Sequence, residues 1–244
     1  MVLSEGKKMS KRSPKGTTFT AEVDAYGADA LRLTLAFAGP PEDNINWEDV
    51  SPAASAKFLA RAFRLALEVT SLPDPDWRTG DVALRRHTHR FLADGPGLAE
   101  SLKFNVLVAR TMELVNLTRK AIDSGPGAGD PAVREATEAI TIALSLFAPF
   151  TAEEMWERLS HQPTVALAGW RKADPTLLVQ ESVTAVIQVD GKVRDRIEVN
   201  PKVSGEELEA LARGSVAVKR AVGDREIANV IVRPPRLVNI ATRG

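Results

Sequence analysis

Apolar residues recur every three or four positions through the first two thirds of the chain, which is the period of an α-helix. Ser51-Pro52 marks one helix start, with serine as N-cap and proline in the first turn, and residues 53–69 continue the pattern. Proline- and glycine-rich stretches separate this segment from similar ones. The same reasoning predicts helices over residues 24–38, 81–93, 98–122, 130–147 and 151–159. Residues 24–162 are therefore predicted to form an up-and-down helical bundle.

The pattern changes after Pro163, where β-branched residues and alternation replace the helical period. Asp190-Gly191 is a tight-turn dipeptide between residues 183–189 and 192–199, which predicts a β-hairpin. Helices are predicted over 204–212 and 215–222, and strands over 227–232 and 237–241. The fold class is therefore mainly α, a bundle followed by a small α+β domain. The predicted boundaries are 1–23 for an N-terminal loop and linker, 24–162 for the bundle, 163–178 for a linker and 179–244 for the C-terminal domain.

Composition narrows the class of protein. The chain has 244 residues, of which 44% are hydrophobic, and this is enough for a packed core. The formal net charge is +0, so any polyanion must bind to local basic patches rather than to a global field. There are no cysteines, which excludes disulfides and thiolate metal sites. No apolar run reaches the ~20 residues that span a bilayer, and we expect a cytoplasmic protein with no membrane partner.

The most informative short segment lies near the start of the chain and reads Lys8-Met9-Ser10-Lys11-Arg12. Lysine ammonium groups suit phosphate oxygens, and they stabilise negative charge that develops on a polyphosphate. By itself a short basic run is more typical of a solvated loop. No scaffold precedes it within the sequence, so we expect the chain to be the C-terminal part of a larger protein.

This segment resembles the Lys-Met-Ser-Lys-Ser signature of class I aminoacyl-tRNA synthetases, and segments further along the chain resemble the leucyl branch of that class in the same order. Each short match is weak alone, but together they cover nearly the whole chain. The segments are Tyr26–Arg32, Gly39–Glu42 with Trp47, Lys103–Asn105, Met112–Asn116, Ala148–Phe150 with Glu153–Glu157, Ile187–Arg194, Val230–Val232 and Leu237–Ile240. The resemblance implies a class I synthetase anticodon-binding helical bundle followed by a small C-terminal tRNA-binding domain.

The resemblance implies that the chain is the C-terminal part of a leucine–tRNA ligase, which activates leucine with ATP and Mg²⁺ and charges leucine-accepting tRNA. Lys11 and Lys8 would act as catalytic residues, and the ATP-binding loop would comprise Lys8, Met9, Ser10, Lys11 and Arg12. Arg12 replaces the last serine of the signature, and Pro14 restricts the loop that follows. We expect both changes to alter nucleotide handling.

The other catalytic motif of the class, His-Ile-Gly-His, does not occur in this sequence, and the editing domain is absent as well. The chain is therefore predicted to be inactive alone and to bind no cofactor by itself. Its expected partners are tRNA and the missing catalytic and editing domains, not DNA.

Basic residues gather at helical spacing and in the predicted hairpin. Such positions either contact tRNA phosphates, with salt-dependent affinity, or form an ordinary solvated face. Alternation along a strand places Lys192, Arg194 and Arg196 on one side of the hairpin. The candidate tRNA-binding residues are Lys57, Arg61, Arg64, Arg85, Arg86, Lys192, Arg194, Arg196, Lys219 and Arg220, with Arg90 and Arg225 as further basic positions.

Other chemistry-bearing residues have structural explanations. His87 and His89 are two positions apart on a predicted helix, so they point to different faces and do not form a metal site. Glu153 and Glu154 suit helix capping. The four tryptophans, Trp47, Trp77, Trp156 and Trp170, suit packing better than base stacking. No metal ligands are therefore predicted.

Two alternative functions remain open from the sequence. The first alternative is a stand-alone tRNA-binding module without catalysis. The second is the equivalent part of a valyl or isoleucyl enzyme. The Asp190-Gly191-Lys192 hairpin argues against the second of these.

Overall fold

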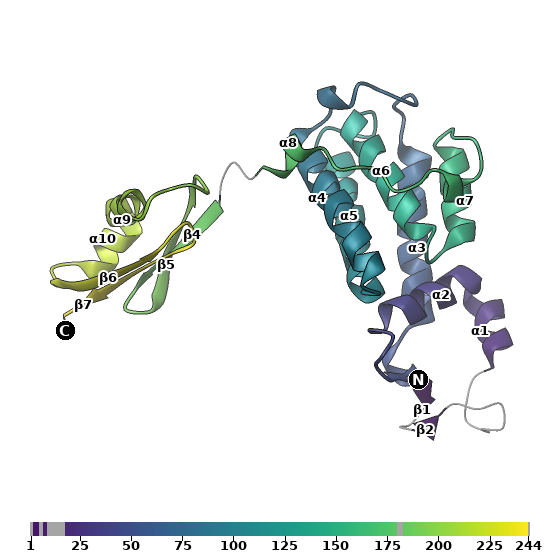
Figure 1. Ribbon diagram of the computed structural model, residues 1–244, viewed down its shortest axis with the longest axis horizontal. Coiled ribbons are helices and arrows are strands. Elements are labelled where there is room, and N and C mark those ends of the chain that lie inside the picture. The colour runs from purple at the N-terminus through teal and green to yellow at the C-terminus, as the bar shows by residue number, and fades with distance from the viewer. Residues whose placement is uncertain (1, 5–6, 9–17, 180–182, 244) are drawn as a thin grey trace. The chain divides into compact units, whose positions relative to one another are not determined.

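The computed structural model describes residues 2–4, 7–8, 18–179 and 183–243. It divides the chain into two compact units, Met1–Leu178 and Val179–Gly244. The first is a helical bundle and the second a small sheet with two helices, so the prediction of a mainly α fold with a C-terminal α+β domain is confirmed (Figure 1). None of the helices within the described residues is both long and apolar enough to cross a bilayer.

The N-terminal part of the first unit carries a small three-stranded sheet and two short helices. Strands β1 (Val2–Ser4), β2 (Lys7–Lys8) and β3 (Ile45–Asn46) lie in the order β2-β1-β3, with β3 parallel to β1. Instead of one helix over 24–38, there are two, α1 (Phe19–Tyr26) and α2 (Ala28–Phe37). Gly27 separates them because its φ of 84° is a left-handed conformation that glycine adopts without strain. A 3₁₀ turn, η1 (Trp47–Asp49), then leads into the bundle.

Five longer helices form the bundle. They are α3 (Pro52–Glu68), α4 (Val82–Glu100), α5 (Phe104–Ser124), α6 (Pro131–Leu144) and α7 (Pro149–Arg158), with the 3₁₀ turn η2 (Trp77–Thr79) before α4. Ser51, Asp81 and Asp130 cap three of them by accepting backbone N–H groups of the first turn. Residues 132–144 of α6 are all buried, so α6 is the central helix of the bundle.

Several helix boundaries differ from the predicted ones; α5, for example, begins at Phe104 rather than at 98. Helix α4 does not stop before Pro96 but runs on to Glu100, because Pro96 removes only one helical hydrogen bond and a side chain from elsewhere bonds the freed carbonyl of Leu92. Helix α7 begins at Pro149 rather than with a capping box at Thr151. The N–H and hydroxyl groups of Thr151 both donate to Asp29, at 2.6 and 2.7 Å.

Residues 163–178, expected from the sequence as a linker, belong to the first unit and pack on the bundle. They include the 3₁₀ turn η3 (Val165–Leu167) and the short helix α8 (Pro175–Leu178). Val165 and Leu177 are buried, and charged side chains of the segment pair with α6. The low helical content made the segment look like a linker, although its side chains are held by tertiary contacts.

The second unit is a four-stranded sheet covered on one face by two helices (Figure 1). Strands β4 (Val183–Val189), β5 (Lys192–Val199), β6 (Ile227–Arg233) and β7 (Leu237–Thr242) lie in the order β5-β4-β7-β6. Helices α9 (Gly205–Gly214) and α10 (Val216–Val222) pack on the face that carries Ile187 and Ile240. This core is separate from that of the bundle.

A β-bulge in β5 overturns the expected grouping of three hairpin cations. Ile187 pairs with Asp195 and Gln188 with Val193, which leaves Arg194 as the extra residue. The alternation is therefore interrupted: Arg196 lies opposite Val186 on the open face, whereas Lys192 lies opposite Val189 on the helix-covered face. The prediction that Lys192, Arg194 and Arg196 share one side is wrong, because a single extra residue reverses the faces beyond it.

Candidate nucleic-acid interface

The first residue of the predicted nucleotide loop lies in the small N-terminal sheet. Lys8 lies in β2 with an exposed side chain, and its strand partner is Leu3 of β1. Leu3 also pairs with Asn46 of β3, which fixes the hairpin to the segment before α3. Met9, Ser10, Lys11 and Arg12 lie outside the described residues, so their predicted role in ATP binding stays a prediction.

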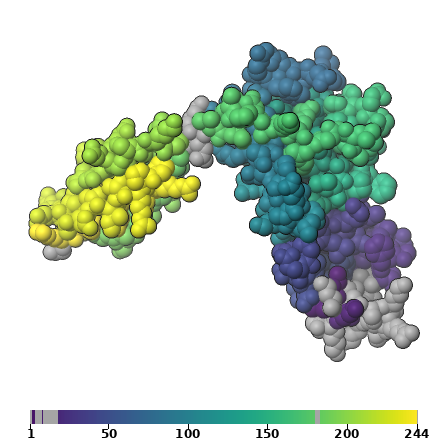
Figure 2. Space-filling view, in the orientation of Figure 1, coloured from purple at the N-terminus to yellow at the C-terminus, as the bar shows by residue number. Residues whose placement is uncertain are grey.

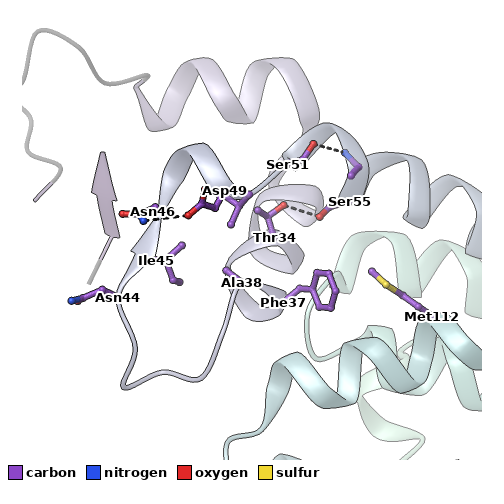
Figure 3. Close-up of a pocket in the computed structure, with 12 residues that line it drawn as sticks. Thr34, Phe37, Ala38, Asn44, Ile45, Asn46, Asp49, Ser51, Ser55 and Met112 are labelled. Atoms are coloured by element: carbon purple, nitrogen blue, oxygen red, sulfur yellow. Dashed lines mark hydrogen bonds between the residues drawn. The ribbon is translucent and has the colours of Figure 1, made fainter. Parts of the chain in front are cut away.

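Behind β3 lies a cavity of about 410 Å³ between α2, residues 44–51, α3 and α5 (Figure 3). Its walls include the apolar side chains of Phe37, Ile45 and Met112. A buried hydroxyl pair lies within it, with Thr34 Oγ1 2.8 Å from Ser55 Oγ. The strand that anchors the N-terminal hairpin is therefore backed by open space on this side rather than by packed side chains.

The basic residues of α3 line one exposed side of the bundle. Lys57, Arg61 and Arg64 are all exposed, as their spacing predicts. The guanidinium of Arg61 donates to Asn116 Oδ1 of α5 at 3.2 Å, which orients it toward α5. This α3 stripe, defined as Lys57, Arg61 and Arg64, presents three cations to solvent on a rigid helix.

An ion pair lies at the C-terminal end of α3, beyond this stripe. Arg119 of α5 donates two hydrogen bonds to the carboxylate of Glu68, at 2.9 and 2.5 Å. These hydrogen bonds lower the pKa of Glu68, with smaller electrostatic contributions from Arg119 and Arg64, while burial opposes the shift. Glu68 therefore stays charged and cancels part of the positive potential at the C-terminal end of α3.

Arg85 is not available to tRNA, so its assignment as a phosphate contact is wrong. The residue is 8% exposed, and its Nε donates to Glu135 of α6 at 2.9 Å. Burial raises the pKa of Glu135, but hydrogen bonds from His89 and Arg85 outweigh this and hold the pKa below its ordinary value. Arg86, beside it, is half-buried, whereas Arg90 is exposed. No sequence signal singles out this pair, because α6 carries Arg134 and Glu138 as well as Glu135.

The two histidines of α4 lie on different sides of the helix, as their spacing predicts. His87 is exposed, whereas His89 is buried with its Nε2 2.9 Å from Glu135 Oε1. No group of three or more His, Asp or Glu side chains in the described part of the chain is arranged to hold a metal ion.

Three of the four tryptophans have clear packing roles. Trp156 stacks on His161 with ring centroids 3.9 Å apart, and Trp170 packs on Phe91 at 5.6 Å. Trp77 lies 5.3 Å from the guanidinium of Arg171. Each of these three rings therefore contacts another side chain of the protein, as a packing role predicts.

The two acidic residues near the start of α7 both have partners. Glu153 caps η3 by accepting from Thr164 and from the N–H of Val165. Glu154 pairs with Arg158 one turn later at 2.7 Å. They are therefore structural groups, although neither caps the start of α7 as the sequence pattern predicts.

In the second unit the basic residues divide between two faces. Arg196, Val186, Leu237 and Arg233 are cross-strand neighbours in one row across the open face of the sheet, so an arginine stands on each edge strand. The next row places the amides of Gln188 and Asn239 side by side. The sequence alone did not identify Arg233, because strand order decides which residues become neighbours.

Lys219 and Arg220 are exposed on α10, which covers the opposite face of the sheet. Arg225 is a structural residue, since it donates to Asp190 at 2.8 Å and to backbone carbonyls of α10. The open face and α10 are therefore two separate basic surfaces.

Comparison with known proteins identifies the fold and the family. The family model described as the anticodon-binding domain of tRNA ligase matches residues 81–210, more than half of the chain. The leucine–tRNA ligase of Leifsonia xyli subsp. xyli is 66% identical over 244 residues, and that of Clavibacter sepedonicus is 63% identical over 242 residues. These matches cover 100% and 99% of this chain but only 28% of each relative.

A solved structure of similar fold is the ternary complex of Agrobacterium radiobacter K84 LeuRS with tRNA and LeuAMS. It matches with a TM-score of 0.79 and 24% identity over 100% of this chain and 33% of that one. The helical bundle with its basic α3 stripe and the family match over α4–α9 lead to one conclusion. The chain belongs to the family of anticodon-binding domains of tRNA ligases.

Proposed function

We propose that this chain is the tRNA-binding part of a leucine–tRNA ligase. The observation that carries the proposal is the similarity to leucine–tRNA ligases along the whole length of the chain. The exposed cations on rigid elements support it, because phosphate contacts supply most of the sequence-independent affinity for nucleic acid.

Two surfaces carry the proposed contacts. The α3 stripe binds backbone phosphates through three exposed cations, one of which is already oriented by Asn116. In the second unit the open face of the sheet is the better candidate. Its two arginines are spaced across four strands and flank aliphatic and amide groups that suit a sugar–phosphate chain and base edges. Lys219 and Arg220 form the competing surface.

For the complete enzyme, we propose that Lys8 and Lys11 contact the phosphates of ATP, which binds with Mg²⁺, while Met9, Ser10 and Arg12 shape the loop. The chain spans only 28% of its relatives, and we expect the remaining part of such proteins to supply the leucine and adenosine sites. The isolated chain is then inactive in leucine-dependent ATP–pyrophosphate exchange. Exchange by the purified chain would refute this.

The salt dependence of tRNA binding tests the proposed contacts. We would measure the affinity of the chain for a leucine-accepting tRNA transcript across salt concentrations, with alanine at Lys57, Arg61 and Arg64 together. Each lost phosphate contact is expected to reduce the slope of log K against log salt by roughly 0.7–0.9. The matched control is Arg158→Ala, which removes an exposed arginine of the same unit that is paired with Glu154. An unchanged slope in the triple variant, or an equal reduction in the control, contradicts the assignment.

A second pair of variants decides which face of the C-terminal unit binds. Arg196→Ala with Arg233→Ala is expected to reduce the slope, whereas Lys219→Ala with Arg220→Ala leaves it nearly unchanged. The reverse result assigns the site to α10. Valine- and isoleucine-accepting transcripts in the same assay test the alternative enzymes, and tighter binding of either one contradicts the leucyl assignment.

A further inference from the structure

Residues 163–178, called the strap below, connect α7 to the end of the first unit. Figure 1 shows the strap passing from α7 across α6 to α4, and in the space-filling view its surface is continuous with the helices beneath (Figure 2). The strap is the last part of the chain held by the bundle before the second unit begins. Whatever fixes the strap therefore sets the length of chain between the two units.

A slot in α4 receives Trp170 of the strap. Pro96 has no N–H, so the carbonyl of Leu92 has no helical partner, and the indole Nε1 of Trp170 donates to it at 2.8 Å. Gly95 provides the space, because a Cβ at this position would lie 2.1 Å from Cζ2 of Trp170. The two residues that usually interrupt a helix here form a specific binding slot within it.

A buried acid of α6 holds another residue of the strap. The side chain of Glu138 is completely buried, and it pairs with Arg171 of the strap at 2.5 Å and with His161 at 2.9 Å. Arg134 of the same helix lies 3.4 Å from it. These contacts satisfy a charge that would be costly to bury alone.

His89 makes the contact whose chemistry depends on protonation. Its Nδ1 is 2.8 Å from the backbone nitrogen of Asp174 in the strap, and a backbone N–H can only donate. Nδ1 must therefore be unprotonated, and the single ring proton lies on Nε2, where it is donated to Glu135 at 2.9 Å. A proton added to Nδ1 would face the N–H of Asp174, and this hydrogen bond would be lost.

We propose that the strap is a pH-sensitive latch, closed on the bundle by neutral His89 and opened when His89 is protonated. The closed state excludes the second proton and the open state accepts it, so closure is favoured at higher pH and lost as pH falls. The latch acts through proton binding alone and needs no ligand.

Charged groups of both signs surround His89, and the carboxylates of Glu135 and Asp174 both interact favourably with its charged form. Glu135 favours the imidazolium, but its carboxylate is already paired with Arg85, whose positive charge disfavours a second cation. The carboxylate of Asp174 accepts from the hydroxyl and N–H groups of Thr176, at 2.7 and 2.9 Å, rather than from His89. Those hydrogen bonds lower the pKa of Asp174, so this carboxylate stays charged between pH 5.5 and 7.5 and does not itself switch.

The latch has a consequence for RNA binding that rests on the proposed function. Opening extends the chain between the bundle and β4 from residues 179–182 to residues 163–182, a roughly fivefold increase. The effective concentration of one site near the other falls as roughly the −3/2 power of this length, which is about tenfold. Joint binding of one tRNA by both units weakens accordingly.

Hydrogen exchange on the purified chain tests the latch itself. We would follow peptides from 169–178 by mass spectrometry at pH 7.5, 6.5 and 5.5, dividing each rate by the intrinsic rate at that pH, with α5 peptides as internal reference. Protection of the strap is expected to fall by up to tenfold per pH unit as the pH decreases, while α5 stays protected. Constant protection of the strap over this range overturns the proposal.

Three variants assign the effect. His89→Gln keeps one donor and one acceptor but does not titrate, so its strap protection is expected not to change with pH. His87→Gln, exposed on the same helix, and His161→Gln, which faces Glu138, should both keep the wild-type fall. The same fall in His89→Gln overturns the assignment. A measurement on the unmodified chain supplements the variants: ¹⁵N spectra at pH 7.5 should show His89 as the Nε2–H tautomer, and the other tautomer contradicts the mechanism.

The affinity for leucine-accepting tRNA separates the latch from the proposed function. Between pH 7.5 and 5.5 the wild-type chain is expected to lose about tenfold more affinity than His89→Gln. Equal losses overturn the link to RNA. An absence of binding at pH 7.5 would refute the proposed function instead, while the exchange experiment still decides whether the latch exists.

Discussion

Replacing Gly95 by alanine tests the packing of the strap most directly. On helix propensity alone the substitution should stabilise α4 by about 0.5–1 kcal/mol. In the folded chain, however, the new methyl group would lie 2.1 Å from Cζ2 and 2.6 Å from Cη2 of Trp170, so the ring must leave the slot. The two arguments predict effects of opposite sign on the same measured free energy of unfolding.

The magnitude follows from what Trp170 loses. Exposing about half of the ~200 Å² that a tryptophan buries costs about 2–3 kcal/mol, and the hydrogen bond to Leu92 contributes about 1 kcal/mol more. After subtracting the propensity gain, Gly95→Ala is expected to destabilise the first unit by about 2–3 kcal/mol. Gly97→Ala is the matched control, since it lies in the same helix with open space around its Cβ position, and it should be stabilising or neutral.

Urea unfolding followed by tryptophan fluorescence measures the effect in the right unit, because all four tryptophans lie between residues 47 and 170. The Trp170→Ala background provides a double-mutant cycle. With the indole absent, Gly95→Ala should lose most of its cost. Stabilisation by Gly95→Ala in the wild-type chain, or an undiminished cost in the Trp170→Ala background, would refute the reasoning.

Two further substitutions separate structural residues from binding residues. Arg85→Ala leaves Glu135 and His89 without their buried cation and should destabilise the first unit by about 3–5 kcal/mol in the same urea assay. The salt slope of tRNA binding should not change at temperatures where the chain stays folded. A smaller slope with intact stability would restore Arg85 as an RNA contact. Asp190 accepts hydrogen bonds from the N–H and the hydroxyl of Thr242 and from the guanidinium of Arg225. The two hydrogen bonds from Thr242 are the main reason that the pKa of Asp190 lies below the ordinary value of 3.8. Because the folded-state pKa is depressed, the contribution of Asp190 to stability is present above pH 4 and is lost as pH falls through the lowered pKa. Circular dichroism melting of the second unit should therefore show acid destabilisation that Asp190→Asn reduces, and an identical pH profile in Asp190→Asn would exclude this role.

Local rules account for much of the agreement between sequence and structure. The cap at Ser51, the helix starts at Asp81 and Asp130 and the turn at Asp190-Gly191 depend on interactions within a few residues, and the sequence predicts each of them correctly. Predicted helix ends were wrong where a side chain far along the sequence supplied a hydrogen bond that the local sequence lacked. The Gly95-Pro96 stretch looked like a break until Trp170, far along the chain, supplied the missing donor.

In the candidate site, too, local spacing predicts some properties and tertiary contacts decide others. The exposure of Lys57, Arg61 and Arg64 followed from helical spacing alone, but Arg85 could not be separated from them without its partner on α6. In the hairpin, simple alternation grouped Lys192 with Arg196, and one bulged residue placed them on opposite faces. Arg233 became a neighbour of Arg196 in the open-face row only through the order of the strands.

The sequence by itself determined the fold class, most of the helices and strands, and the resemblance to tRNA ligases, because periodicity, capping and turn chemistry act over short distances along the chain. Only the tertiary structure decided that Arg85 is buried, which face of the sheet carries Arg196, and that residues 163–178 are held against the bundle. These properties depend on pairings between residues far apart in sequence, such as Arg85 with Glu135 and Trp170 with Leu92. Burial and hydrogen bonding at such pairs are set by the packing of whole elements, and no local pattern records them.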